Sequence, residues 1–347
     1  MYDIGCDQHK HYCLMVAVNE QGKCVSEEKI YHNNPTQLER YLSRVPSGSR
    51  IAIEACGFDA WLCDRIESYG HEVHLAHPLK TRAIAEAKIK TDILDARTLA
   101  KLMHGDLLAE SYYAPGEVRE KRYLLRYRQC LVVYRTGVKN RIHGLLHRQG
   151  IRSPGISDLL GVQGLDWLKH VELPSIYRKA LRGYLAVLDA LKKQLNECEK
   201  EIKKILKEDP QARLLQTVPG VGKISAFLLL AEIGPLERFP SPEKLCSYAG
   251  IVPSYHQSGQ VEYRGPITKQ GNKFIRWILV EAAHIAVRKD PALKEFYQRI
   301  RYKKGTHKAT VAVARKLLTY VYHILKRQEA YRYQPRYPKK PGLTFVS

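Results

Sequence analysis

A change in the spacing of apolar residues near residue 105 most constrains the fold of this chain. Before it, apolar residues come in short runs bounded by turn signals, such as YDIGCD, CLMVAV and IAIEAC. Between residues 115 and 208 they recur at helical spacing over long stretches. Short runs of this kind indicate strands, and the longer spacing indicates amphipathic helices. The sequence therefore predicts an α/β unit followed by mainly α-helical structure.

The first part of the chain predicts its elements in a definite order. Three strands come first, with the turn signal NEQGK between the second and the third. Four elements follow them in turn, a helix in NPTQLERYLSRV, a strand in IAIEAC, a helix in WLCDRIESY and a strand in EVHLAHP, before a further helix. A meander followed by alternating crossovers is typical of the ribonuclease H fold. We place this first domain at residues 1–108.

The central part, residues 109–208, is predicted to be a basic helical segment. A helix near residues 117–148 precedes a break that contains Gly and Pro, and a second helix spans residues 176–208. Leucine and isoleucine fall roughly at a and d positions in this second helix. The pattern fits a coiled-coil hairpin or dimerisation arm, and equally a long helix packed within its own domain.

The C-terminal part, residues 209–328, is predicted to be a mainly α-helical domain with Gly-rich loops. Pro210 ends the preceding helix because proline lacks the N–H that a helix interior needs. Residues 329–347 form a Pro- and Lys-rich tail, which we expect to be loosely ordered.

Charge is the strongest signal in the composition. Lysine and arginine number 57 against 35 for aspartate and glutamate, a net charge of +22. A basic surface attracts polyanions, and its clustering along the chain favours nucleic acid. No stretch approaches the roughly 18 apolar residues that span a membrane. No signal peptide is apparent, and the eight cysteines form no CxxC pair. We expect a cytoplasmic protein with no membrane partner and with cysteines acting as small buried hydrophobes.

Four carboxylates are candidates for one site. Asp7 ends the first strand, and Glu54 ends IAIEAC, which should lie beside that strand. Asp92 and Asp95 are three residues apart, so they share one face of a helix. Carboxylates that converge repel one another unless cations lie between them, and oxygen ligands suit Mg²⁺ or Mn²⁺. Each acid taken alone could equally be an ordinary surface residue.

Two glycine-containing motifs in the C-terminal part suit phosphate. TVPGVGKISAFLLLAEIG resembles a helix-hairpin-helix, in which the backbone at Gly220, Gly222 and Lys223 could approach a phosphate. The alternative is a turn between packed helices. Lys269 and Asn272 bracket a glycine just before another predicted helix, which is a second geometry of this kind.

In combination these motifs resemble a known family. IGCDQHK, IAIEACGF and KTDILDARTLA look like the Asp-Glu-Asp-Asp transposases of the insertion-sequence 110/1111 family. AGIVPSYHQSG with RGPITKQGNKFIR resembles the family's C-terminal domain, so the resemblance runs from about residue 2 to about residue 325. It implies a RuvC-like N-terminal domain of ribonuclease H fold and a prokaryotic, nucleoid-associated recombinase of donor and target DNA. It also implies that the four acids are catalytic metal ligands.

The resemblance also implies a nucleophilic serine. The family's serine falls on a Ser-Gly pair, which is Ser258 here, and its hydroxyl would form a covalent phosphoserine. Composition alone would not single it out, because Ser254 and Tyr263 are nearby competitors. Basic neighbours that could neutralise the phosphate are Arg264, Lys269, Lys273 and Arg276.

A structured non-coding bridge RNA is a further partner that the resemblance implies. The helix at 117–148 fits RNA contact, because tyrosines that could stack on bases (Tyr123, Tyr127, Tyr134) accompany many cations. The cations are Arg119, Lys121, Arg122, Arg126, Arg128, Arg135, Lys139, Arg141 and Arg148. The alternative is a solvated basic helix whose tyrosines lie in its core. A homo-oligomer, dimer or tetramer, could build a composite site across protomers through the helix at 176–208.

Two other functions fit parts of the pattern. A stand-alone RuvC-like junction resolvase would need the four acids and not Ser258. A non-catalytic nucleic-acid-binding protein would bind DNA unchanged after loss of Asp7, Glu54 or Ser258.

Overall fold

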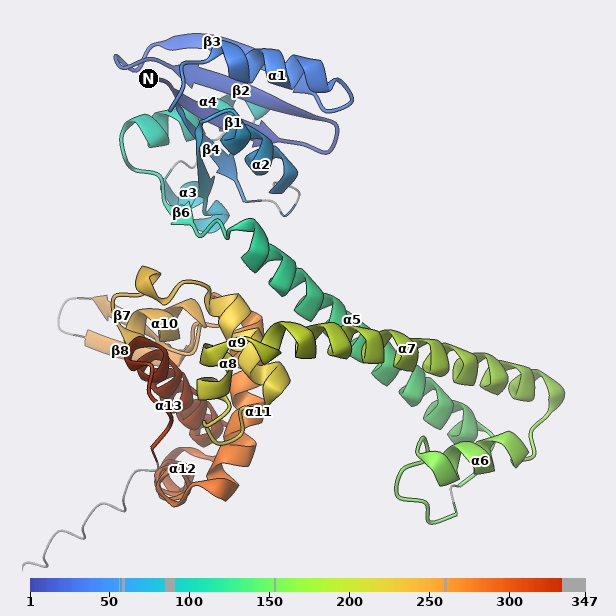
Figure 1. Cartoon of the computed structure of the whole chain (residues 1–347). Coiled ribbons are helices and arrows are strands. Elements are labelled where there is room, and N and C mark those ends of the chain that lie inside the picture. Colours follow the sequence, from blue (N-terminus) through green and yellow to red (C-terminus); the bar gives the residue numbers. More distant parts are fainter. Residues whose placement is uncertain (56, 58–59, 85–90, 153, 259–260, 333–347) are drawn as a thin grey trace, which may run out of the picture. The chain divides into compact units, whose positions relative to one another are not determined.

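The chain forms two compact units, Met1–Ala114 and Pro115–Ser347. The computed structural model describes residues 1–55, 57, 60–84, 91–152, 154–258 and 261–332 (Figure 1). The first unit contains a sheet with helices and the second is mostly helical. The predicted division into an α/β part and a mainly helical part is therefore confirmed. Within these described ranges, no helix is long and apolar enough to cross a membrane.

The first unit is built on a sheet with strand order β3-β2-β1-β4-β5-β6. Antiparallel pairs join β1 to β2, β2 to β3 and β5 to β6, whereas β1–β4 and β4–β5 are parallel. The strands are β1 (Asp3–Gln8), β2 (Tyr12–Val18), β3 (Cys24–Tyr31), β4 (Arg50–Glu54), β5 (Glu72–Ala76) and β6 (Glu110–Ser111). The helices are α1 (Pro35–Arg44), α2 (Ala60–Ser68), α3 (Pro78–Ile84) and α4 (Asp92–His104).

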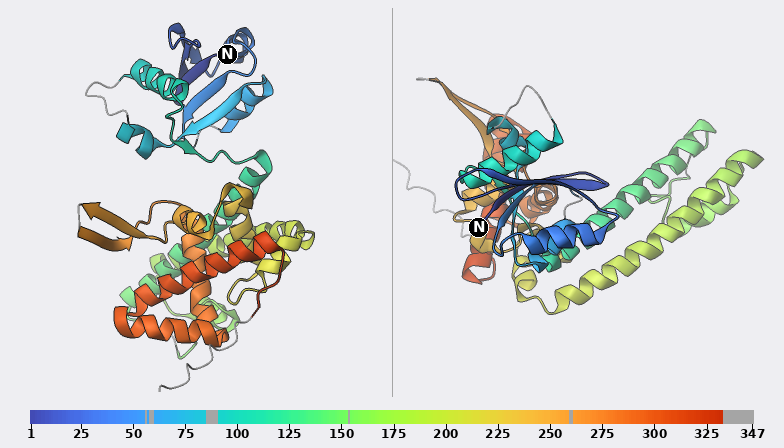
Figure 2. Two further views of the ribbon diagram at one scale, coloured as in Figure 1. Left: turned by 90° about the vertical axis from the view of Figure 1, so that its left-hand side faces the viewer. Right: turned by 90° about the horizontal axis from the view of Figure 1, so that it is seen from above.

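Helices cover the two faces of this sheet differently. On one face, strand residues such as Cys6 and Ile53 share a core with residues of α1 and α2. On the other face lies α4 (Figure 2). Its Leu99 packs with Ala52 of β4. A Cβ added at Gly5 would lie 1.8 Å from the carbonyl oxygen of Ala96, so the backbones of β1 and α4 are in contact. This close approach brings the start of α4 against the end of β1.

The second unit begins with two long antiparallel helices that form an arm. Helix α5 (Gly116–Arg148) packs along α7 (Ser175–Lys207), and α6 (Val162–His170) lies at the far end (Figure 1). Buried residues of α7 pack against other parts of the same chain. Leu181 packs at the tip of the arm, where α5, α6 and α7 meet, and Ile202 packs against the helices of the C-terminal core. The tyrosines of α5 do not form its core, since Tyr123 is 76% exposed and Tyr134 is 58% exposed.

The remaining elements form a helical core that carries one two-stranded hairpin. The helices are α8 (Pro210–Leu215), α9 (Lys223–Ile233), the short 3₁₀ helix η1 (Leu236–Arg238), α10 (Pro242–Tyr248), α11 (Lys273–Lys289), α12 (Pro291–Lys304) and α13 (Thr306–Arg327). The hairpin consists of β7 (Pro253–Ser258) and β8 (Val261–Ile267), which are antiparallel and project from the helices (Figure 2). The sequence predicted only Gly-rich loops here, so the hairpin is a difference from that expectation.

A buried glutamate fastens the arm to this core. Glu232 of α9 is only 1% exposed, and Arg126 of α5 donates to both of its carboxylate oxygens, at 3.1 and 3.0 Å. The side-chain amide of Asn272, which caps α11, donates to the same carboxylate at 2.7 Å. Arg122 donates to the backbone carbonyl oxygens of Ala231 and Glu232. Three helices therefore meet at one carboxylate.

We expect Glu232→Ala to destabilise the second unit by about 1–3 kcal/mol, because it leaves the Asn272 amide and the partly exposed Arg126 guanidinium without their shared acceptor. Glu232→Gln, which keeps the shape and loses the charge, should cost less. Urea denaturation followed by helical circular dichroism measures the change. Asp189→Ala is the matched control, because its partner Lys193 lies on the exposed face of α7. If Glu232→Ala has the same midpoint of urea unfolding as the wild type, the contacts of Glu232 add no net stability.

Candidate functional site at the acidic edge of the sheet

Strand register places two of the predicted acids side by side. Cys6 of β1 pairs with Ile53 of the parallel strand β4, and Asp7 and Glu54 are the next residues of the two strands. Adjacent strands lie about 4.8 Å apart and successive side chains point to opposite faces. Because Cys6 and Ile53 face the core under α1 and α2, Asp7 and Glu54 belong to the face that α4 covers.

The start of α4 supplies the other two acids. Thr91 caps this helix by accepting a hydrogen bond from the Leu94 amide at 3.3 Å. Asp92 and Asp95 both lie in the first turn, where the helix dipole favours negative charge. They are one turn apart and so share a side of the helix. The close contact of α4 with β1 therefore brings this turn to the end of β1.

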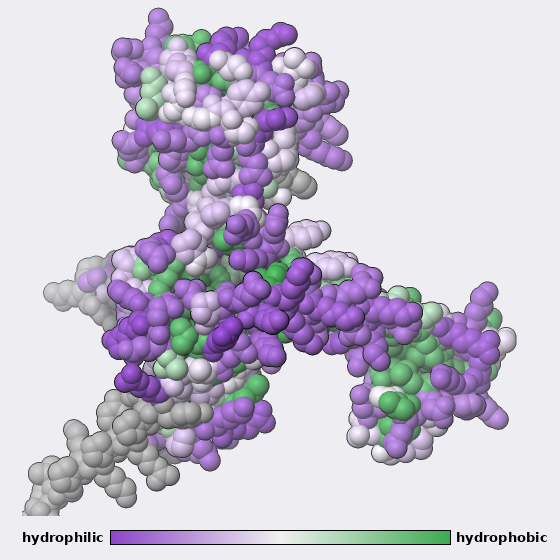
Figure 3. Space-filling model, viewed as in Figure 1, coloured by the Kyte–Doolittle hydropathy of each residue, from purple (hydrophilic) through white to green (hydrophobic). Residues whose placement is uncertain are grey.

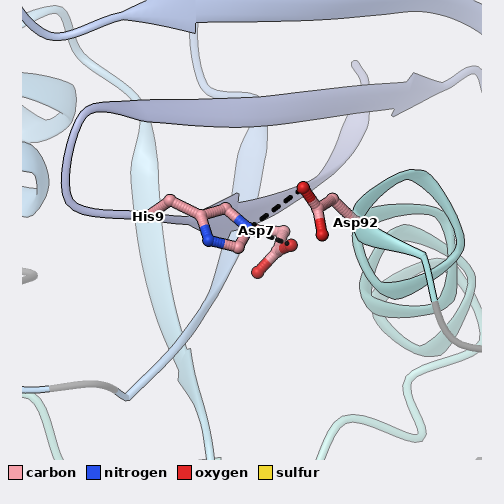
Figure 4. A group of neighbouring side chains, drawn as sticks. All are labelled: Asp7, His9 and Asp92. Atoms are coloured by element: carbon pink, nitrogen blue, oxygen red, sulfur yellow. Dashed lines mark hydrogen bonds and ion pairs between the residues drawn. The ribbon is translucent and has the colours of Figure 1, made fainter.

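The side chains of Asp7 and Asp92 meet at a histidine that the sequence analysis did not single out. The Nε2 atom of His9 lies 3.0 Å from Asp7 Oδ2 and 3.3 Å from Asp92 Oδ2 (Figure 4). One donor atom from each of the three residues lies within 4.8 Å of the others. His9 thus lies between the carboxylates of Asp7 and Asp92.

A second layer holds Asp92 in place. The Tyr12 hydroxyl donates to Asp92 Oδ2 at 2.7 Å, and the Tyr12 ring stacks on His9 with ring centroids 4.7 Å apart. The Lys29 ammonium lies 3.7 Å from the centroid of the Tyr12 ring on the strand beside it. This chain of contacts orients the carboxylate of Asp92 toward the Asp7 side of the site.

Burial and neighbouring charge act in opposite directions on the two acids. Burial raises the pKa of Asp7, the hydrogen bond from His9 lowers it, and the charges of Asp92 and Asp95 raise it further. The net direction of the pKa of Asp7 is upward. The pKa of Asp92 is lowered, chiefly by the Tyr12 hydrogen bond. Asp7 therefore carries its negative charge at a cost that a nearby cation would reduce.

The structure brings the four predicted acids together to different degrees. Asp7 and Asp92 both contact His9, and the charge of Asp95 raises the pKa of Asp7. Glu54 lies beside Asp7 in the sheet, but the donor group found within the described ranges consists of Asp7, His9 and Asp92 only. His9 follows Asp7 by two residues, and this Asp-x-His spacing is the feature of the sequence that could have identified His9 as a site residue.

The predicted nucleophile lies in the second unit. Ser258 is the last residue of β7, and its backbone pairs with Val261 of β8. Its side chain and that of Arg264 fall outside the described part of the structure, as do residues 259–260. Lys269 adopts a positive φ of 53° on the loop that leads from β8 to α11, and Lys273 is exposed in the first turn of that helix.

Several residues predicted to contact nucleic acid have partners within the protein. Arg122, Arg126 and Asn272 are engaged at Glu232, as described above. Arg141 donates to the carbonyl oxygen of Gly137, one turn earlier on α5. Arg119 and Lys139 are half-buried on the same helix.

The PGVG turn divides into a packed half and an open half. A Cβ added at Gly220, whose φ is 86°, would lie 2.3 Å from the carbonyl oxygen of Ala282 of α11. Nothing lies within 4 Å of a Cβ added at Gly222, which is the N-cap of α9, and Lys223 beside it is exposed. Gly222 and Lys223 are therefore exposed, whereas Gly220 packs closely against α11.

We expect Tyr12→Phe to weaken divalent-metal binding at this site by about 10- to 100-fold, because Asp92 loses the hydrogen bond that orients it. Calorimetric titration of the purified protein with Mn²⁺ measures the effect. Tyr31→Phe is the matched control, since that ring is nearby in the same sheet and 48% exposed. Equal Mn²⁺ affinity in Tyr12→Phe and the control would show that the hydroxyl does not position a metal ligand.

Comparison with known proteins covers both units. A family model described as transposases of the IS116/IS110/IS902 family matches residues 212–298, and an IS110-type Asp-Glu-Asp-Asp transposase model matches residues 4–150. The transposase of insertion sequence element IS1111A from Coxiella burnetii is 26% identical over 95% of this chain and 91% of its own length. The transposase of element IS1328 from Yersinia enterocolitica is 27% identical over 78% of this chain and 77% of its own.

A shorter match is to a protein named for DNA inversion. The pilin gene-inverting protein of Moraxella bovis is 34% identical over 40% of this chain and 42% of its own length. One family model covers the first unit and continues through α5, and the other lies within the second unit. The relative that matches over nearly its whole length is an insertion-sequence transposase. The chain therefore belongs to the IS110/IS116/IS902 family of insertion-sequence transposases.

Proposed function

We propose that this transposase cuts and rejoins DNA with a divalent-metal site on the acidic edge of the first unit and with Ser258 as its nucleophile. The observation that carries the first half is the convergence of Asp7 and Asp92 within 4.8 Å at the end of β1. The strand order of the first unit, three antiparallel strands continued by parallel ones, supports a RuvC-like ribonuclease H fold. Ser258 rests on the family's motif and on its place at the end of β7.

The donor set fits a hard cation. Asp7, Asp92, Asp95 and Glu54 offer carboxylate oxygens, which Mg²⁺ and Mn²⁺ prefer. When bound, the metal would stabilise the negative charge that develops on a phosphate under attack. Among this chain's own residues, Tyr12 holds Asp92 in position, and His9 contacts both Asp7 and Asp92. The raised pKa of Asp7 supports the proposal, because a divalent cation offsets both burial and the neighbouring acids.

The serine would form a covalent intermediate. Its hydroxyl oxygen forms a bond to the phosphorus as the P–O bond to one side of the DNA breaks, and the departing oxygen takes a proton to become a hydroxyl end. Attack by a hydroxyl end of the second DNA reverses these steps and releases the serine. The phosphodiester bond energy is conserved throughout, as rejoining requires.

Guidance by a structured RNA and assembly into an oligomer complete the proposal. Exposed Tyr123 and Tyr134 on the basic helix α5 support contact with RNA bases. The tip of the arm supports assembly, since hydrophobic residues gather at its surface (Figure 3). There Val162 is 89% exposed and Ile176 is 78% exposed. Contiguous exposed apolar residues mark interaction sites.

One experiment tests the proposal as a whole. Purified protein is incubated with a donor–target plasmid pair, the RNA encoded beside the element, and Mg²⁺. We expect recombinant plasmid and a DNA–peptide adduct that mass spectrometry locates at Ser258. Recombination with no adduct at Ser258 would overturn the nucleophile, and undiminished recombination without the RNA would overturn RNA guidance. Undiminished recombination in EDTA would overturn the metal site.

A further inference from the structure

A pocket of about 610 Å³ lies in the second unit, at the foot of the β7–β8 hairpin. Residues at the start of β7 and the end of β8 line one part of it, and residues of α12 and the beginning of α13 line the rest. Its apolar lining residues include Ile251, Ile267, Ile300, Val311 and Ala312, which together are called the floor. A pocket of several hundred Å³ with an apolar floor is of the size that encloses a small organic group.

The walls of this pocket carry charge of one sign. Lys269, Arg299, Lys303, Lys304, Lys308 and Arg315 line it together with His307, and no acidic residue does. Among the residues that the structure describes, none of these six cations forms an ion pair with a carboxylate. Arg126 differs from these cations because it forms an ion pair with Glu232. Six cations that form no ion pair within the described ranges favour an anionic occupant.

The start of α13 adds to the same field. This 22-residue helix follows Gly305, which offers no side-chain cap, and its first turn contains no acidic residue. His307 and Lys308 of that turn line the pocket. The first N–H groups of a helix lack intrahelical partners, and the dipole there favours anions such as phosphate.

We propose that this pocket binds one unpaired nucleotide of a nucleic-acid strand, with its phosphates on the lysines of α12 and α13 and its base on the apolar floor. The combination of charges and floor selects this occupant. A duplex presents phosphates and keeps its bases stacked inside, so it would leave the apolar floor unfilled. A free phosphate would not use the floor either. A nucleotide that has left the stack presents both chemistries at once.

The position of the pocket gives it a role in the proposed strand transfer, and this part of the inference rests on the proposed function. Ser258 is the fifth residue after Pro253, which lines the pocket, and five steps along a strand span about 17 Å at the usual rise per residue. A nucleotide held here therefore lies a few nucleotides from the phosphate that the serine attacks. It would keep a cleaved strand from leaving before it is rejoined.

Two variants separate the two halves of the pocket. Lys304→Ala combined with Lys308→Ala removes two cations, and Ala312→Phe fills the floor without changing the charge. The control is Lys289→Ala combined with Lys294→Ala, which removes two exposed lysines of the same unit outside the pocket. Fluorescence anisotropy measures the affinity of the full-length protein for an oligonucleotide of about 15 residues, as single-stranded DNA, single-stranded RNA or duplex DNA, over a range of KCl.

We expect the double lysine variant to bind both single strands about tenfold more weakly than the control. The slope of log affinity against log salt should fall in magnitude by about 1.4, since each single-strand phosphate contact contributes about 0.7. Ala312→Phe should weaken single-strand binding and leave duplex binding unchanged. A larger loss for DNA than for RNA, or the reverse, identifies which strand the pocket takes.

Three results would overturn the inference. Equal losses in the double variant and its control would show that only total charge matters. Unchanged single-strand binding in Ala312→Phe would show that no base uses the floor. Unchanged oligonucleotide binding with a changed oligomeric state, measured by light scattering, would assign the pocket to an acidic segment of a second copy. These binding measurements need no cleavage, so failure of the wild-type protein to recombine DNA would contradict the proposed function and leave the pocket result standing.

Discussion

Asp7→Asn is expected to reduce metal-dependent DNA cleavage by roughly 10³-fold or more. Metal ions supply several kcal/mol of transition-state stabilisation, and about 1.4 kcal/mol corresponds to a factor of ten in rate. Asparagine keeps the size of the side chain and its contact with His9 while removing the negative charge that would bind the cation. The rate of plasmid cleavage in Mg²⁺ measures the effect, and calorimetric titration with Mn²⁺ measures metal binding on the same protein.

Loss of folding would not explain such a result. Burial and the neighbouring acids raise the pKa of Asp7 in the folded protein above its usual value. The contribution of this group to stability is therefore largest below its unfolded pKa and falls as the pH rises through its folded pKa. At neutral pH the Asp7 charge destabilises the metal-free fold, so metal-free Asp7→Asn should unfold at or above the wild-type temperature.

The matched control for this prediction is Glu67→Gln, which removes one negative charge from an exposed position on α2 of the same unit. It should cleave at the wild-type rate. Cleavage by Asp7→Asn at the wild-type rate would show that the acidic edge takes no part in the reaction. Loss of Mn²⁺ binding with normal cleavage would show that the metal held there is not the one that the reaction needs.

The acidic edge could be predicted from the sequence because strand periodicity fixes where side chains point. Asp7 and Glu54 each follow an apolar run, and parallel pairing of the two strands places such residues at one edge. Asp92 and Asp95 follow from the three-residue spacing on a helix. His9 could not be predicted in the same way, because it lies beyond the last residue of β1, where strand alternation no longer sets its direction.

The roles of the basic residues, in contrast, could not be predicted from the sequence. Composition treats all arginines and lysines alike, yet Arg126 meets a buried carboxylate whereas Lys304 lines an open pocket without an ion-pair partner. The difference depends on Glu232, which is over a hundred positions from Arg126 in the sequence and is brought near it only by packing of α9 on α5. Long-range packing of this kind leaves no periodic signal in the sequence.

The sequence contains a weak signal for the hairpin whose first strand ends at Ser258. HQSGQVEY alternates in a way that fits two short strands around a Ser-Gly turn, but it contains few β-branched residues. Recognition of the strands matters for function, because a serine at the end of a hairpin is carried on paired backbone rather than on an irregular loop. Paired strands position a nucleophile more precisely than a loop does.

Ser258→Ala is expected to abolish the covalent protein–DNA adduct and to reduce recombination by roughly 10⁴-fold or more, as loss of a nucleophile does in covalent catalysis. Because the acidic edge lies in the other unit, Mn²⁺ binding should equal that of the wild type. Denaturing gel electrophoresis with end-labelled DNA detects the adduct, and plasmid transformation counts the recombinants.

Ser254→Ala and Tyr263→Phe are the controls that the hairpin itself provides. The Ser254 hydroxyl packs against Gly265 of the opposite strand, 2.4 Å from where a Cβ on that glycine would lie. Tyr263 is 63% exposed and is paired with His256 across the hairpin. Loss of the adduct in Tyr263→Phe alone would make the tyrosine the nucleophile. If Ser258→Ala still recombines while Asp7→Asn does not, DNA is cut by the acidic metal site alone, and water rather than serine attacks the phosphate.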